Sequence, residues 1–459
     1  MERLPRVGVP FGVILVEAHS TMGLRFTRRG FIRTGAGVAA AAFWGAAVQG
    51  SQRAAADRLP QAYFGLHPDI ENNPKAVFLY RTKVPHKLAV DAKREAGLAL
   101  AREIFVPMDQ PGIPISHRVV LKPNATGLDR DSSRPEALLG VGTDTNFYEG
   151  LVLGLKEIGL SKFQFIDSTN YPYWNVRGYN DVNERLGIAM NEPWCRPRHL
   201  REGDGIHWSP VPDGVVFKRI PHYAPVNEPD TWLLNIAKWK AHAMGLTQSV
   251  KNEQGLVAHP YTAFCEGWEG VLGVPDFMQP DMNPNAERYI KDLFERHRQR
   301  GYSRYDSKGA RQNGLLITPI TQEIWAHKTC DNQSTLKTGL SMIEGIYGRD
   351  GDGFYLGRDY LTNLVMFSKQ PFRLDVIGLY LGGHEPGNVH LYRIAKERGL
   401  TDTFNPHEIP VFEWAGGHAA PRKLSDFQRT PLRTVFLPRE KEPRLHLLDE
   451  PFDYDRNKA

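Results

Sequence analysis

The segment from residue 118 to residue 167 alternates strand, helix and strand. Arg118–Leu121 is a short apolar run, and Asn146–Ile158 carries apolar residues at helical spacing and ends before Gly159. Phe163–Asp167 begins as a second apolar run. Two strands joined by a helix in this way are parallel, with a right-handed crossover. This βαβ unit predicts an α/β fold built on a parallel sheet.

The same alternation continues downstream. Trp232–Ala237 is almost continuously apolar, as is typical of a strand covered on both faces. The other predicted strands are Leu315–Ile317, Leu364–Phe367 and an edge strand, Ile409–Phe412. The other predicted helices are Leu336–Ile346, Phe372–Leu381 and Val389–Arg398. The expected fold class is α/β, with a mostly parallel sheet layered by helices, a charged helical insertion at about 283–311 and an extended C-terminal tail.

The first 56 residues have the pattern of a bacterial export signal. Arg28 and Arg29, with Phe31 two places on, match a twin-arginine motif, and small uncharged residues and an Ala-Ala-Ala site at 54–56 follow it. The apolar run is shorter than the roughly 20 residues that a membrane span needs. We expect export in the folded state by the twin-arginine machinery, no stable membrane span after cleavage, and a periplasmic or otherwise extracytoplasmic location.

These features divide the chain into four parts. The signal peptide occupies 1–56, an N-terminal segment 57–117, the α/β domain 118–415 and the tail 416–459. The signal holds seven arginines and two glutamates, so it accounts for the whole formal charge of +5. The remaining 403 residues carry 50 basic and 50 acidic side chains. A basic overall charge therefore gives no reason to expect a nucleic-acid partner.

Cysteine usage and short motifs exclude several kinds of site. The three cysteines, Cys195, Cys265 and Cys330, are far apart and form no C-x-x-C pair, so we expect neither a disulfide framework nor an iron–sulfur cluster. No nucleotide P-loop, G-x-G-x-x-G after a strand, H-E-x-x-H or G-x-S-x-G occurs. The sequence therefore offers no standard cofactor or nucleophile motif.

Polar side chains follow the predicted strands at the edge where ligands bind in open parallel sheets. They are Lys122, Asn124, Asp167, Lys238, Lys240 and His242. Ammonium groups suit an anionic ligand, and an imidazole or a carboxylate can transfer a proton. Lys251 and Asn252, close to Gly255, add a second candidate binding segment. The alternative is that these strand ends are polar only because they reach solvent.

A third group of candidates consists of carboxylates in or near a glycine-rich segment. Glu344, Asp350 and Asp352 could coordinate a hard divalent cation, with Asp375 as a further candidate. The alternative, which the Asp-Gly pairs favour, is a plain turn, and Asp375 could simply complement a helix dipole. The cofactor thus remains open, with a divalent cation as one option.

The sequence resembles the family called domain of unknown function 362 from about Val119 to Leu400. The matching blocks are Val120–Asn124, Asn235–His242, Lys251-Asn252 with Gly255, and Ile343–Gly353 followed by Pro371 and Asp375. The second block is similar to the family's Pro-Lys-x-Lys-x-His segment, with Ala237 in place of the proline. Glu344 and Gln370 stand where the family commonly has aspartate. The resemblance implies a shared fold and site, without the ferredoxin-type clusters of many members.

Three functions are compatible with these observations. The first is an exported protein whose Lys/His/Asp crevice binds a small anionic molecule and acts on it. In that case His242 is the acid/base group, Lys122, Lys238 and Lys251 stabilise negative charge, and Asp167 orients the ligand or a metal. The second is an oxygen-ligated metal enzyme. The third is a non-catalytic extracytoplasmic binding or assembly protein that uses residues 283–311 and the tail.

Overall fold

The computed structural model describes the greater part of the chain after the leader. The described ranges are 62–109, 111–126, 140–168, 171–191, 205–242, 245–258, 261, 278–299, 310–312, 315–317, 319–351, 357–435 and 445–456. The predicted signal with Arg28, Arg29 and Phe31, the predicted ligand Asp352 and part of the charged insertion lie outside these ranges. Among the described helices, none is long and apolar enough to cross a membrane.

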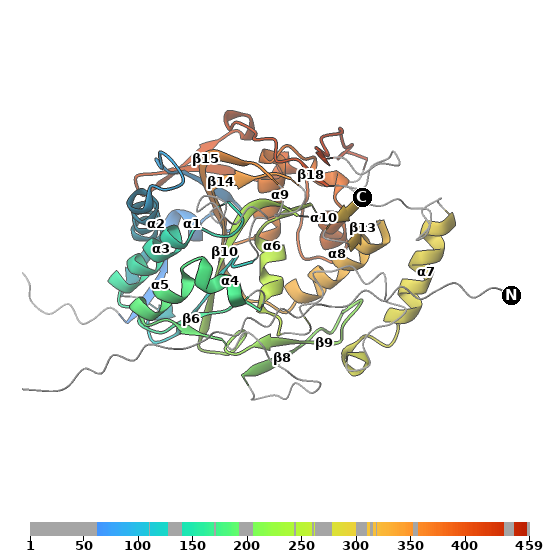
Figure 1. Ribbon diagram of the computed structural model, residues 1–459, viewed down its shortest axis with the longest axis horizontal. Coiled ribbons are helices and arrows are strands. Elements are labelled where there is room, and N and C mark those ends of the chain that lie inside the picture. The colour runs from blue at the N-terminus through green and yellow to red at the C-terminus, as the bar shows by residue number, and fades with distance from the viewer. Residues whose placement is uncertain are drawn as a thin grey trace, which may run out of the picture. The chain divides into compact units, whose positions relative to one another are not determined.

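A ten-stranded sheet forms the centre of the protein (Figure 1). In spatial order its strands are β17 (His418–Arg422), β16 (Val411–Ala415), β2 (Val77–Arg81), β15 (Asp359–Ser368), β14 (Thr338–Arg349), β10 (Thr231–His242), β5 (Arg118–Pro123), β6 (Phe163–Phe165) and β7 (Ala189–Met190). The tenth, β11 (Gly245–Thr247), pairs with the end of β10. Only β15, β17 and β11 run against the common direction of the other strands in this sheet. The prediction of a mostly parallel α/β sheet is confirmed.

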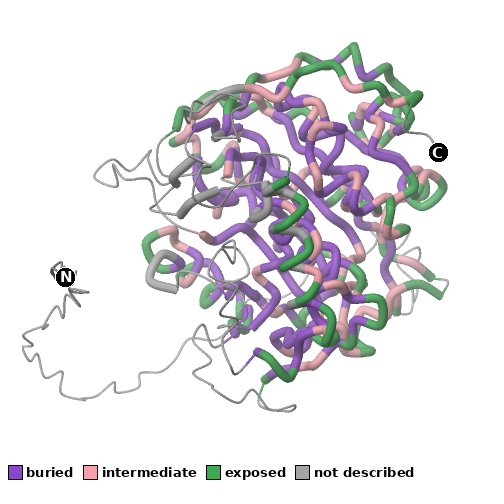
Figure 2. Tube along the Cα trace, turned by 90° about the vertical axis from the view of Figure 1, so that its right-hand side faces the viewer, coloured by how far each residue is buried: buried purple, intermediate pink, exposed green. Residues whose placement is uncertain are grey.

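Helices cover both faces of this sheet, as Figure 1 shows. One layer consists of α2 (Val90–Ile104), α3 (Thr145–Glu157) and α5 (Tyr179–Leu186), and the other of α6 (Ser249–Asn252), α8 (Pro319–Gln333), α9 (Pro371–Leu381) and α10 (His390–Glu397). Alternate residues of β10 enter the two cores: Leu234 and Ile236 pack with the α2–α3 layer, and Ala237 and Trp239 with the α9–α10 layer. Burial on both sides explains the continuous apolar run of β10. Figure 2 shows that the buried segments of the chain gather in the interior of the protein.

Smaller elements surround this core. They are β1 (Tyr63–Leu66), α1 (Pro68–Glu71), β3 (Phe105–Met108), β4 (Ile113–Pro114), α4 (Tyr171–Val176), β8 (Ile206–Pro210), β9 (Arg219–Tyr223), η2 (Glu253–Leu256), α7 (Ala286–Gln299), β12 (Ala310–Gln312), β13 (Leu315–Ile317), β18 (Thr434–Val435) and β19 (Leu445–His446). The charged insertion thus contributes the helix α7.

The direction of winding reverses between β5 and β10. From β5 the chain crosses over α3 to β6 and then over α5 to β7, moving toward one edge of the sheet. From β10 it crosses through α6 and α8 to β14, on the other face and toward the other edge. In open α/β sheets such a switch point separates the loops above the strand ends and forms the usual ligand crevice. The boundary between β5 and β10 is therefore where a site is expected.

One predicted helix is wrong. Residues 336–346 do not form a helix, because β14 occupies 338–349 as a central strand. Its residues are buried on both faces, so the apolar residues show no period of two that would distinguish a strand from a helix. Gly339 lies against the Trp232 indole, where a Cβ atom would come within 2.0 Å of Nε1. The glycines in this segment are therefore sites of close packing in a strand.

Other predicted boundaries also shift. β10 continues past Ala237 to His242, so its lysines lie within the strand rather than after it. The predicted edge strand, β16, is covered on its outer side by β17, which the beginning of the tail supplies. β13 pairs with β12 in a separate two-stranded sheet. The segment before Arg118 contributes β2 to the central sheet and α2 to a covering layer.

Candidate functional site

Lys122 lies at the end of β5 and is completely enclosed by polar groups. It is 1% exposed, and its Nζ donates to Asp167 Oδ2 at 2.8 Å, to the Pro123 carbonyl at 2.6 Å and to Asn252 Oδ1 at 3.4 Å. Asp167 follows the neighbouring strand β6 and also accepts a hydrogen bond from the Ala125 amide. The ends of β5 and β6 therefore share a buried ion pair.

Asn252 and Gly255 form the other side of this ion pair. Asn252 Nδ2 donates to the Lys122 carbonyl at 2.9 Å and to Asn235 Oδ1 at 2.8 Å, which ties α6 to β5 and β10. A Cβ atom at Gly255 would lie 2.5 Å from Lys122 Cε and 2.8 Å from its Nζ. The Lys-Asn-x-x-Gly segment thus packs directly on Lys122, because only glycine leaves room for the amine.

Replacing Gly255 by alanine should lower the free energy of unfolding by about 1–3 kcal/mol, because the methyl group overlaps the Lys122 side chain. Chemical denaturation measures the change. Gly187→Ala is the matched control, since no atom lies within 4 Å of the Cβ position there. Its left-handed φ of 65° alone should lower the free energy of unfolding by about 1 kcal/mol. In a Lys122→Ala background the cost of Gly255→Ala should shrink, whereas equal costs in both backgrounds would contradict the packing argument.

Asn124 connects the ends of β5 and β10. Its amide nitrogen donates to Thr143 Oγ1 at 2.9 Å, and that hydroxyl donates to the Ile236 carbonyl at 2.6 Å. The side-chain Nδ2 donates to Asn252 Oδ1 at 3.0 Å. These bonds bring Asn124, which sequence analysis assigned to the strand end, to the switch point itself.

A second buried ion pair lies between β10 and β14. Lys238 Nζ donates to both Glu344 oxygens, at 3.0 and 2.8 Å, and neither residue is more than 1% exposed. Glu344 also accepts from the amides of Asp144 and Ile346. Asp144 is the N-cap of α3 and pairs with buried Lys93 at 2.6 Å. Glu344, a predicted metal ligand, therefore accepts four hydrogen bonds from three donor groups.

Lys240 lies among other cations. Its Nζ donates to the Val141 carbonyl, and the residue is fully buried. Burial lowers the pKa of this amine well below its ordinary value, and the positive charges of Arg177, Lys251, Arg349 and Lys238 lower it further. A negative charge beside these groups would offset the positive charges that lower the pKa of Lys240.

His242 lies at the end of β10, close to the same cations. Burial lowers its pKa well below the ordinary value, and the charges of Lys251 and Lys240 add to the effect. The imidazole is consequently neutral at physiological pH and can accept a proton. Because an anion would offset the neighbouring positive charges, its binding would raise the pKa of both His242 and Lys240.

Arg177 and Tyr179 belong to this region although sequence analysis did not select them. The Tyr179 hydroxyl donates to the Thr143 carbonyl at 2.8 Å, and burial raises its pKa. Burial lowers the pKa of Arg177 to about 10. A Cβ atom at Gly142 would lie 2.6 Å from the Asn124 carbonyl and 2.9 Å from an Arg177 guanidinium nitrogen. The strand-end rule cannot find these two residues, because Arg177 precedes α5 and Tyr179 begins it.

The remaining predicted metal ligands are used elsewhere. Asp375 in α9 accepts from the Ser249 and Val250 amides and from the Ser249 hydroxyl, so it anchors the start of α6. Asp350 accepts from the Arg358 amide and the Tyr360 hydroxyl and pairs with Arg433. Within the described ranges, no three His, Cys, Asp or Glu side chains lie close enough to hold a metal ion. The segment from Glu344 to Arg349 is strand rather than a loop.

Two buried carboxylic acids near α6 have unusual pKa values. Burial raises the pKa of Asp375 to about 7, although Ser249 and the amides counteract it. Burial likewise raises the pKa of Glu253 to about 7, against hydrogen bonds from Thr338 and Gln333. Both groups therefore titrate near neutrality in the layer that supports Lys251 and Asn252.

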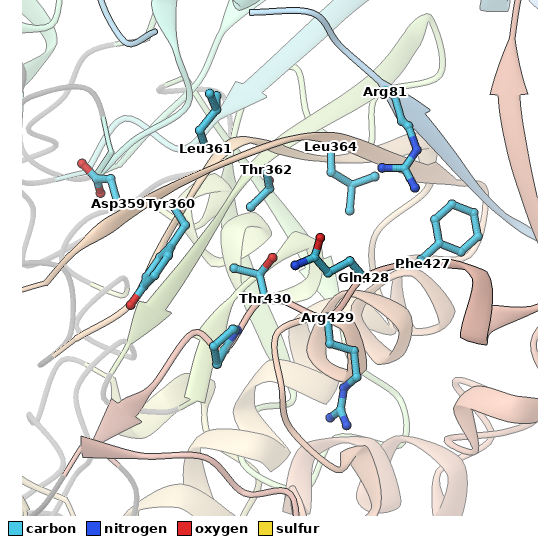
Figure 3. Close-up of a pocket in the computed structure, with 11 residues that line it drawn as sticks. Arg81, Asp359, Tyr360, Leu361, Thr362, Leu364, Phe427, Gln428, Arg429 and Thr430 are labelled. Carbon is cyan, nitrogen blue, oxygen red and sulfur yellow. The ribbon is translucent and has the colours of Figure 1, made fainter. Parts of the chain in front are cut away.

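A pocket of about 490 Å³ lies beside β15 (Figure 3). Its lining includes Arg81, Phe427, Gln428, Arg429 and Thr430, and Arg429 points away from the centre. The two arginines already have acidic partners, Glu413 for Arg81 and Asp449 for Arg429. The predicted site residues do not line this pocket, but two residues that do, Asp359 and Tyr360, bond to Arg349 and Asp350.

A comparison with protein-family models identifies the family of this chain. The model described as Domain of unknown function (DUF362) matches residues 119–380, more than half of the chain. The chain belongs to this family. The matched region begins on β5 and ends in α9, so it includes Lys122, Asp167, Lys238, His242, Lys251 and Glu344. Comparisons with curated proteins and with solved structures gave no match.

Proposed function

We propose that this DUF362 member binds a small anionic ligand at the boundary of β5 and β10 and acts on it by acid/base chemistry. The observation that carries the proposal is the position of buried Lys240 at this boundary, near Arg177, Lys251, Arg349 and Lys238. Burial lowers the pKa of its amine, and the positive charges of these neighbours lower it further. A bound anion would offset the positive charge and favour the protonated amine. The location of these groups at the topological switch point supports the same conclusion.

The groups at this boundary have distinct roles in the proposal. Lys240, Lys251 and Arg177 supply the positive charge that holds the anion. His242 is the proton acceptor, because its imidazole is neutral and lies near the same cations. Asp167 accepts a hydrogen bond from Lys122 and orients that amine. The chemistry is thus a proton transfer at a ligand whose negative charge the lysines and the arginine balance.

Sulfate is the most direct probe, since it does not titrate in the neutral range. Sulfate binding should be accompanied by proton uptake, because the anion raises the pKa of Lys240 and His242, and sulfate affinity should therefore fall as the pH rises. Titration calorimetry in two buffers of equal pH but different ionisation enthalpy measures the number of protons taken up.

Two variants complete this experiment. Lys251→Met should weaken sulfate binding at least ten-fold, because it removes a cation from the cluster. Lys369→Met is the control, since Lys369 is paired with Glu71 on the surface and should leave the affinity unchanged. Sulfate binding without proton uptake, or equal losses in both variants, would refute the proposal.

We also propose that the protein works outside the cytoplasm after twin-arginine export. The arginine pair at 28–29, the short apolar run and the Ala-Ala-Ala site support this location. Export in the folded state suits a protein whose site is assembled from strands far apart in the sequence, because the buried ion pairs form before translocation. Removal of the signal would leave a protein of zero formal net charge.

A further inference from the structure

Asn124 has a buried side-chain oxygen that accepts no hydrogen bond. The residue is 7% exposed, and within the described part of the chain its Oδ1 has no partner although Nδ2 is bonded. Buried carbonyl oxygens in native proteins are almost always paired, so an unmatched one at a candidate site points to a missing donor. The orientation of the Asn124 amide decides whether the unmatched atom is an acceptor or a donor.

A chain of hydrogen bonds determines which atom of Asn124 is unmatched. The Lys122 carbonyl can only accept, so the Asn252 group that faces it at 2.9 Å must be Nδ2. Asn252 Oδ1 must then face Lys122 Nζ and Asn124. Asn124 consequently donates to Asn252 with its own Nδ2. Its acceptor, Oδ1, is the atom left without a partner.

Two more buried side-chain oxygens at this edge of the sheet have no hydrogen-bond partner. Ser168 Oγ belongs to the residue after Asp167, and Thr247 Oγ1 to the residue opposite Lys240 on β11. Hydroxyl groups can either donate or accept, so they fit several ligands. The carbonyl oxygen of Asn124 can only accept, so it requires a hydrogen-bond donor on the ligand.

We infer that the ligand is a hydroxy acid, whose acid group is held by the cations around Lys240 and whose hydroxyl donates to Asn124 Oδ1. This inference rests on the proposed function and narrows it. A deprotonated carboxylate or sulfate has no hydrogen to offer, so neither of these two groups alone satisfies Asn124. An ammonium donor is disfavoured beside Lys240, Lys251 and Arg177, whereas a hydroxyl is neutral.

Matched pairs of acids that differ by one hydroxyl test the inference. Glycolate should bind about ten-fold more tightly than acetate, and malate about ten-fold more tightly than succinate, because only the hydroxy acids satisfy Asn124. Glycine, which carries an ammonium in place of the hydroxyl, should bind less tightly than glycolate. Calorimetric titration of the mature protein measures each ratio.

Asn124→Leu should bring both ratios close to one, since it removes the acceptor. A purely structural role of Asn124 would lower all affinities by the same factor and leave the ratios unchanged, which would overturn the inference. Equal binding of the hydroxy and deoxy acids to the unmodified protein would also overturn it while leaving the anion site intact. Failure of sulfate and of every acid to bind would refute the proposed function itself.

Discussion

Lys238→Met should lower the free energy of unfolding by about 3–5 kcal/mol, because it leaves Glu344 charged in the core without its cation. Lys238 and Glu344 are 1% and 0% exposed, so water cannot take the place of the ammonium group. The amides of Asp144 and Ile346 still donate to the carboxylate, but they carry no full charge. Chemical denaturation of the mature protein measures the loss.

Two comparisons distinguish the free-energy cost of an unpaired buried charge from the cost of lost side-chain contacts. Glu344→Gln in the Lys238→Met background should recover a large part of the stability, because the unpaired charge is gone. Lys369→Met removes a partly exposed partner of Glu71 and should cost less than about 1 kcal/mol. The interpretation fails if the double variant is no more stable than Lys238→Met, or if the two lysine variants lose equal stability.

Substitution of Arg28 and Arg29 together by lysine should reduce the amount of exported protein at least ten-fold, with folded protein accumulating in the cytoplasm. The twin-arginine pathway recognises the arginine pair itself rather than its charge, so two lysines are not equivalent. Immunoblots of periplasmic and cytoplasmic fractions measure the distribution. N-terminal sequencing of the exported form should begin at Asp57, after the Ala-Ala-Ala site.

Arg33→Lys is the matched control, because this arginine lies in the same basic region but outside the pair. It should leave export unchanged. If Arg28 and Arg29 can both be replaced without loss of exported protein, the chain does not use this pathway. If Arg33→Lys blocks export to the same degree, the effect comes from the basic region as a whole.

Local sequence patterns were sufficient to predict the helices that have a regular apolar spacing or a glycine or proline at one end. The helix α3 followed from its apolar spacing and from Gly159, and α9 and α10 were predicted with boundaries that differ by one residue from those observed. The central strand β14 was mistaken for a helix, since burial on both faces removes the alternation that identifies a strand. The strand β2, in the segment before Arg118, was not predicted.

In the candidate site, too, sequence reasoning found some residues and missed others. Strand-end reasoning selected Lys122, Asn124 and Asp167, which lie together in one hydrogen-bonded group with Asn252. It did not select Arg177 or Tyr179, whose positions depend on how α5 packs. Asp375 was proposed as a metal ligand, yet it anchors α6, and no sequence pattern shows which backbone amides will face a carboxylate.

By itself, the sequence determined the α/β alternation, the pattern of the leader and the residues of the Lys-Asn-x-x-Gly and Lys-x-Lys-x-His segments, since each depends on neighbours within a few positions. Only the tertiary structure decided that β5 and β10 lie side by side with crossovers on opposite faces. That choice depends on strand pairing between residues more than 100 positions apart. It places Lys122 next to Asn252, whereas the pairing of β10 with β14 places Lys238 next to Glu344. These long-range pairings together bring the positively charged groups near Lys240.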